Sequence, residues 1–138
     1  MKTLLIGLIF SIGISINAQE SEALSKTVGE LFAFSKNKNY QAVCSLIAFS
    51  GENSSRKYKS SLNPKSKSEL DQGKRIAKKI KAYLDISDSH KILRSSSETV
   101  DETQLQTLVI AFTSGSQQLK IPFKFVKVED KFLLVDID

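Results

Sequence analysis

Regular alternation of apolar and polar residues near the C-terminus constrains the fold of this chain more than any other feature. In residues 117–128, QQLKIPFKFVKV, large apolar residues occupy every second position and lysines lie between them. Successive side chains point to opposite faces of a β-strand, so we expect one face of this strand in a core and the other in water. The apolar face holds Leu119, Ile121, Phe123 and Phe125, and the other face holds Lys120, Pro122 and Lys124.

Three further segments are predicted to be strands because they are rich in residues that favour β-strands and are bounded by turn residues. They span residues 90–100, 103–113 and 131–138. Ser114–Gly115–Ser116 predicts a hairpin turn, and Glu129–Asp130 predicts another turn before the last strand. In the second strand, the residues expected on one side are Leu108, Ile110 and Phe112, and those on the other are Leu105, Val109 and Ala111.

The first half of the mature chain has helical periodicity instead. Residues 21–35 carry apolar side chains at helical spacing, with Ser21 as the expected N-cap. A short helix is predicted over residues 39–49, capped by Asn39 and ended by Ser50–Gly51. A third helix is predicted over residues 69–84, with one apolar arc. That arc consists of Ile76, Ala77, Ile80, Tyr83 and Leu84.

Helices followed by a meander of strands predict an α+β fold, in which N-terminal helices pack on one face of a curved antiparallel sheet of about four strands. The length of residues 19–138 suits one domain with one core. Residues 50–68 are rich in serine and are expected to form a loop within that domain. The lysines on the second face of the third strand predict that this face meets water.

Residues 1–18 have the layout of a cleavable signal peptide. Lys2 precedes an apolar run from Leu4 to Ile16, and cleavage is expected after Ala18. A membrane anchor is the alternative, but the run is short, contains Gly and Ser, and lacks a basic stop-transfer cluster after it. We therefore predict a secreted or periplasmic protein that has no membrane span after cleavage. A single cysteine cannot form an internal disulfide, so packing must stabilise the domain.

Several segments resemble the nuclear-transport-factor-2-like superfamily. KNKNYQAVCSLIAFSGEN, residues 36–53, is similar to the step from the first helix to a short apolar helix in those domains. LKIPFKFVKVEDKFLLVDID, residues 119–138, is similar to their last hairpin. The resemblance implies a cystatin-like fold with helices lying in a curved sheet. FSGENSSRKYKS, NPKSKSELD and VDID together resemble a group of small exported bacterial proteins of this class to which no activity is assigned, so the resemblance implies a fold and no function.

The residues give little support to catalysis. The positions expected to face the helices are apolar, and a cavity enzyme would need an acid, a base or a histidine there. The only histidine, His90, is interpreted as an exposed loop residue, and Cys44 as a buried small apolar residue. Metal-ligand spacing is absent, and Asp136 and Asp138 are expected to be solvated. We therefore expect neither an enzyme, nor a metal, nor a cofactor.

The clearest candidate for binding is the basic middle of the chain. Residues 56–94 contain 12 Lys and Arg residues but only four carboxylates, which favours an anionic partner. The alternative is an ordinary solvated helix face and a mobile loop. Nucleic acid is disfavoured because aromatic residues do not recur at base-stacking intervals. The candidate binding residues are Glu52, Arg56, Lys57, Tyr58, Lys74, Arg75, Lys78 and Lys81.

Three functional hypotheses follow. The first is a small exported, non-enzymatic binding or accessory protein, whose partner is an anionic polymer, an envelope protein or a small apolar ligand held between helices and sheet. The second is a surface protein that binds polyanions through residues 56–81. The third and least favoured is a cavity enzyme of the isomerase or dehydratase kind.

Overall fold

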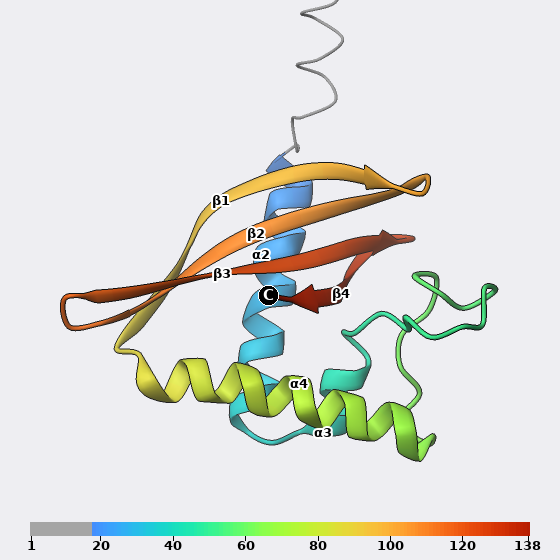
Figure 1. Cartoon of the computed structure of the whole chain (residues 1–138), viewed down its shortest axis with the longest axis horizontal. Helices are drawn as coiled ribbons and strands as arrows, with labels where there is room; N and C mark the ends of the chain where they lie inside the picture. Colours follow the sequence, from blue (N-terminus) through green and yellow to red (C-terminus); the bar gives the residue numbers. More distant parts are fainter. Residues whose placement is uncertain (1–17) are drawn as a thin grey trace, which may run out of the picture.

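The computed structural model describes residues 18–138, which form helices followed by a four-stranded antiparallel sheet (Figure 1). This confirms the predicted α+β class. The expected signal segment lies, except for Ala18, outside the described residues. Among the described residues, no helix has the length and apolar character needed to cross a membrane. The elements are α2 (Ala18–Lys36), α3 (Tyr40–Cys44), α4 (Lys67–Ile86), β1 (Ser89–Val100), β2 (Thr103–Ser114), β3 (Gln117–Val128) and β4 (Lys131–Ile137).

The strands lie in sequence order, and the predicted alternation sets their register. Leu108 is opposite Phe123 and Ile110 is opposite Ile121, so the apolar faces of β2 and β3 combine into one inner face. Leu119 departs from the expectation of a core position, because 43% of its surface is exposed. It lies at the end of the sheet beside Ile86, where α4 ends and no longer covers the strands.

Helix α2 packs against the inner face, behind the strands in Figure 1. It begins at Ala18, so Ser21 lies inside the helix and the predicted N-cap at this residue is wrong. The ring of Phe32 lies 5.9 Å from that of Phe112 and 6.0 Å from that of Phe123, which joins the helix to the centre of the sheet. The buried residues of α2 are Leu24, Thr27, Val28, Leu31, Phe32 and Ser35.

Helix α3 begins as predicted but ends earlier. The Asn39 side chain accepts a hydrogen bond from the Ala42 N–H, which confirms the cap. The helix stops at Cys44, and the prediction that it continues to Phe49 is wrong. Residues 46–48 instead run beside β4, with hydrogen bonds of 2.8 Å from Leu134 N to Leu46 O and from Ala48 N to Leu134 O. Without this segment the outer edge of β4 would leave backbone groups unpaired, and pairing them outweighs helix propensity.

The serine-rich loop is held at its base by the same segment. Phe49 N donates to Ser60 O at 2.8 Å, and Leu62 N donates to Ile47 O at 2.9 Å. Helix α4 then begins at Lys67, two residues before the predicted start. Tyr58 from the loop packs on the outer face of the sheet, over a small buried cluster. That cluster consists of Ala48, Leu105, Val126 and Leu133.

The outer face is therefore only partly exposed to water. Lys120 is exposed as predicted, whereas Val109 and Ala111 between the flanking strands are buried. The prediction that this face meets water is wrong at its β4 side, because Tyr58 and Ala48 cover it.

Candidate functional site

Helix α4 carries a row of cations along its exposed side. Lys74, Lys78 and Lys81 are separated by four and three residues, which places them on successive turns of one face. Arg75 lies beside this row. We call these four residues the α4 basic face. The opposite side of the helix is fixed in the core by Ala77 and Ile80, both fully buried.

The four cations differ in their partners. Lys81 forms a 2.6 Å ion pair with Asp85 on the next turn. The Lys74 ammonium lies 5.7 Å from the centre of the Tyr40 ring. Among residues 18–138, no carboxylate lies within ion-pair distance of Lys74, Arg75 or Lys78. Three of the four charges are therefore available to an outside anion.

These three available side chains line an open hollow of about 470 Å³ together with Ser68 and Asp71. Asp71 contributes the one carboxylate of this lining, so the hollow holds three cationic groups and one anionic group. Such a surface attracts anions by Coulomb forces that salt screens.

A second hollow of about 300 Å³ lies between α4 and β4. Arg75 lines both hollows, and Lys79 and Asp136 line this one. Lys79 Nζ donates to Ile137 O at 3.2 Å, so its charge is attached to the end of the sheet. Because Arg75 lines both hollows, it extends the α4 basic face toward β4.

Arg56, a predicted binding residue, is occupied inside the protein. Its Nη2 lies 2.8 Å from Glu69 Oε1 and its Nη1 3.3 Å from Glu69 Oε2, which is a bidentate pair. Its remaining donors reach Ser60 Oγ and Ser61 O, and its guanidinium lies 4.0 Å from the centre of the Phe49 ring. Arg56 therefore ties the serine-rich loop to the first turn of α4.

The same contacts lower the pKa of the Glu69 carboxyl. The hydrogen bonds from Arg56 are the largest cause, partial burial opposes them, and the Asn63 N–H at 3.0 Å lowers the pKa further. A carboxyl whose pKa is lower in the folded state stabilises the fold above its unfolded pKa. This stabilisation is lost as the pH falls through the lower, folded-state pKa.

Replacing Glu69 by glutamine is therefore expected to destabilise the protein at neutral pH. The difference in unfolding free energy from the native chain should shrink as the pH falls below about 4.3, the ordinary glutamate pKa. Urea unfolding at a series of pH values measures it. The matched control is Asp85→Asn, which breaks an exposed pair on the same helix and should have a much smaller effect. A difference for Glu69→Gln that does not change with pH would contradict this account.

The other candidates of the serine-rich loop are placed differently from one another. Tyr58 is half-buried on the outer face of the sheet, and its backbone has a left-handed φ of 59°. Lys57 is exposed, with its ammonium 5.4 Å from the centre of the Tyr58 ring, and Glu52 is exposed. The structure thus separates the candidates into an α4 group and a loop group that is joined to α4 through Arg56.

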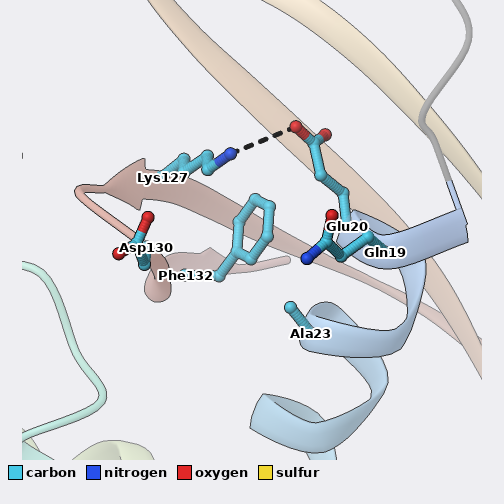
Figure 2. A pocket seen from close by; sticks show the side chains of 6 residues that line it. All are labelled: Gln19, Glu20, Ala23, Lys127, Asp130 and Phe132. Carbon is cyan, nitrogen blue, oxygen red and sulfur yellow. Dashed lines mark hydrogen bonds and ion pairs between the residues drawn. The ribbon is translucent and has the colours of Figure 1, made fainter.

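A further hollow of about 270 Å³ lies where the start of α2 meets the β3–β4 turn (Figure 2). Lys127 Nζ and Glu20 Oε1 form a 3.2 Å ion pair on one side, and Asp130 lies on the turn. Phe132, which is 1% exposed, forms part of the lining. Because its cation is already paired, this hollow has less to offer an anion than the α4 basic face.

The two nucleophilic or basic groups considered from the sequence lie away from these hollows. Cys44 is fully buried, and burial, followed by the charge of Glu69, raises the pKa of its thiol. A protonated, buried thiol is a poor nucleophile. His90 is exposed as predicted, but it lies in β1 and not in a loop, with its ring 4.9 Å from that of Phe32.

Sequence reasoning missed the role of Glu69. Ser66 is the N-cap residue of α4, so Ser66-x-x-Glu69 matches the capping-box pattern and could have drawn attention to this carboxylate. The carboxylate instead reaches Arg56 and the Asn63 N–H. The pattern identifies the start of the helix, but only the folded loop brings Arg56 to the Glu69 carboxylate.

Comparisons with protein-family models, with curated proteins and with solved structures find no match to this chain.

Proposed function

We propose that this chain is a small exported, non-enzymatic binding module that holds an anionic polymer on the α4 basic face. The observation that carries the proposal is the set of three cations, Lys74, Arg75 and Lys78, which have no carboxylate partner among the described residues and share one hollow. Unpaired cations gathered on one surface attract anions and release counterions when they bind them.

The spacing of the cations favours a polymer over a small ion. The available cations Lys74 and Lys78 lie on successive turns of one helix face, about 6 Å apart along the axis at 1.5 Å per residue, and Lys81 on the next turn is paired with Asp85. A linear chain of charges can contact each turn in succession, whereas a single small anion reaches one turn. Among residues 18–138, only the Tyr40 ring lies within cation–π distance of these cations, and base stacking needs several exposed rings. An acidic polysaccharide is therefore the proposed class, with an acidic envelope protein as the alternative.

The other hypotheses have less support. The space between helices and sheet is filled by large side chains that are fully buried, among them Leu31, Ile110 and Phe123. Such packing leaves little room for an apolar ligand or a substrate. The resemblance to nuclear-transport-factor-2-like domains remains part of the proposal, and so does export through residues 1–18. Together they favour a binding role in the periplasm or outside the cell.

Reversing the three available charges, as Lys74→Glu, Arg75→Glu and Lys78→Glu, is expected to weaken binding of heparin by on the order of 10- to 100-fold at low salt. The slope of log affinity against log salt concentration should fall by about 2 to 3. Titration calorimetry of residues 19–138 at several salt concentrations measures both quantities.

A second triple variant provides the control. Lys26, Lys36 and Lys131 are exposed and lie on other elements, so their reversal changes the net charge equally without touching α4. It should retain most of the affinity. Equal losses of affinity in the two triple variants would mean that binding depends only on net charge, which contradicts the proposal. Native affinity in the α4 variant would contradict it as well.

A further inference from the structure

Within residues 18–138, strand β1 is an open edge of the sheet. The sheet order is β1-β2-β3-β4, and the far edge at β4 is covered by residues 46–48. No described segment covers β1, which runs along the upper edge of the sheet in Figure 1. It is 12 residues long and lacks proline. An exposed strand edge carries unpaired N–H and C=O groups and is a template for pairing with another strand.

The charges on this edge are self-complementary. A register shift between Ile92 and Arg94 interrupts the strand near its start, and the pairing with β2 is regular from Arg94 to Val100. Arg94 and Glu98 are four residues apart in this regular part, so both lie on the outer face of the sheet. Their β2 partners, Val109 and Leu105, lie on that face too. Between them stand three serines, Ser95–Ser97, whose small side chains leave the edge accessible.

We propose that two copies of this chain pair antiparallel through β1, about a twofold axis at Ser96. Ser96 then lies opposite Ser96 of the second copy, and Arg94 lies opposite Glu98 of the second copy. The twofold axis repeats this pair, so the interface contains two cross-strand ion pairs and no like charges among these positions. The two sheets join into one continuous sheet of eight strands.

The contacts that Glu98 already makes are compatible with this arrangement. Lys124 Nζ lies 3.5 Å from Glu98 Oε1 on the outer face, and both side chains are partly exposed. A carboxylate has several acceptor positions and can accept from Lys124 and from Arg94 of the second copy together. Ser97 Oγ donates to Gln106 Oε1 at 2.9 Å on the inner face, so that side chain remains bonded within its own sheet.

The pairing goes beyond the proposed anion binding and does not depend on it. The test below measures only the size of the protein, so its failure leaves the heparin experiment unaffected.

Charge reversals on β1 test the proposal. Arg94→Glu alone places Glu opposite Glu98, and Glu98→Arg alone places Arg94 opposite Arg, each twice per dimer. We expect each variant to raise the dissociation constant of the dimer about tenfold or more. An equimolar mixture of the two variants restores opposite charges at both pairs and should dimerise again. Sedimentation velocity over a range of chain concentrations measures the outcome.

Two control variants distinguish an effect at the β1 edge from an effect of charge on the outer face of the sheet. Lys120→Glu makes the same charge change as Arg94→Glu on the outer face of β3, and Lys124→Gln removes the Glu98 ion pair without touching β1. Both should dimerise as the native chain does. A native chain that stays monomeric at millimolar concentration overturns the proposal, and so does a mixture of the two β1 variants that fails to dimerise.

Discussion

Replacing Phe123 by alanine is expected to lower the free energy of unfolding by about 3 to 5 kcal/mol. Phe123 is fully buried in the inner face of β3, opposite Leu108 and in ring contact with Phe32 and Phe112. Truncation removes apolar surface from the core and leaves a cavity that rigid neighbouring strands cannot close. Since small domains are stable by only about 5 to 15 kcal/mol, this loss is a large fraction of the total stability.

Urea unfolding followed by circular dichroism measures this loss. Leu119→Ala is the matched control, because Leu119 lies on the same strand and the same face but is 43% exposed. We expect it to lose less than about 1 kcal/mol. Similar losses at the two positions would mean that the helices do not cover the centre of the sheet as described.

Replacing Gly73 by alanine is expected to lower the free energy of unfolding, which is opposite to what helix propensity alone predicts. Helix propensity alone predicts that alanine inside α4 stabilises the protein by about 1 kcal/mol. In the fold, however, a Cβ on Gly73 would lie 2.5 Å from the Sγ of Cys44, which is buried where α3 meets α4. The two helices must then separate or the cysteine must rotate, and overpacking of this kind destabilises by about 1 to 3 kcal/mol.

The double variant Cys44→Ala with Gly73→Ala identifies the cause. Removing the sulfur leaves the new methyl 3.8 Å from the Cβ of residue 44, which is ordinary contact. We therefore expect the double variant to be more stable than Gly73→Ala alone, although Cys44→Ala alone is destabilising. The coupling energy from the four unfolding free energies should be favourable. Additive effects would show that the sulfur and the methyl do not compete for one space.

The elements predicted with success are those whose pattern is local. The alternation in residues 117–128 and the turns at Ser114–Ser116 and 129–130 predicted the strands and their inner face, and the register confirms them. The apolar arc of α4 was predicted from its periodicity, and Ala77 and Ile80 are buried as expected. Asn39 was identified as a cap because its hydrogen bond spans only three residues.

The residues of the candidate site also divide into those that a local pattern predicts and those whose role depends on distant contacts. The α4 basic face could be predicted because helical spacing alone places Lys74, Lys78 and Lys81 on one side. The internal role of Arg56 could not, because its partner Glu69 is 13 residues away and the loop between them has no periodic pattern. The position of Tyr58 depends likewise on the outer face of the sheet, which the loop meets only after folding.

By itself, the sequence determined which segments are helices or strands and which of their faces are apolar, because periodicity reflects the geometry of each element. Only the tertiary structure decided which distant segments pair their backbone hydrogen-bonding groups and which distant residues pack against each other. Residues 46–48 leave the helix to pair with β4, and Gly73 accommodates the sulfur of Cys44. These outcomes depend on backbone hydrogen bonds and close packing between residues far apart in the chain, and no local pattern encodes them.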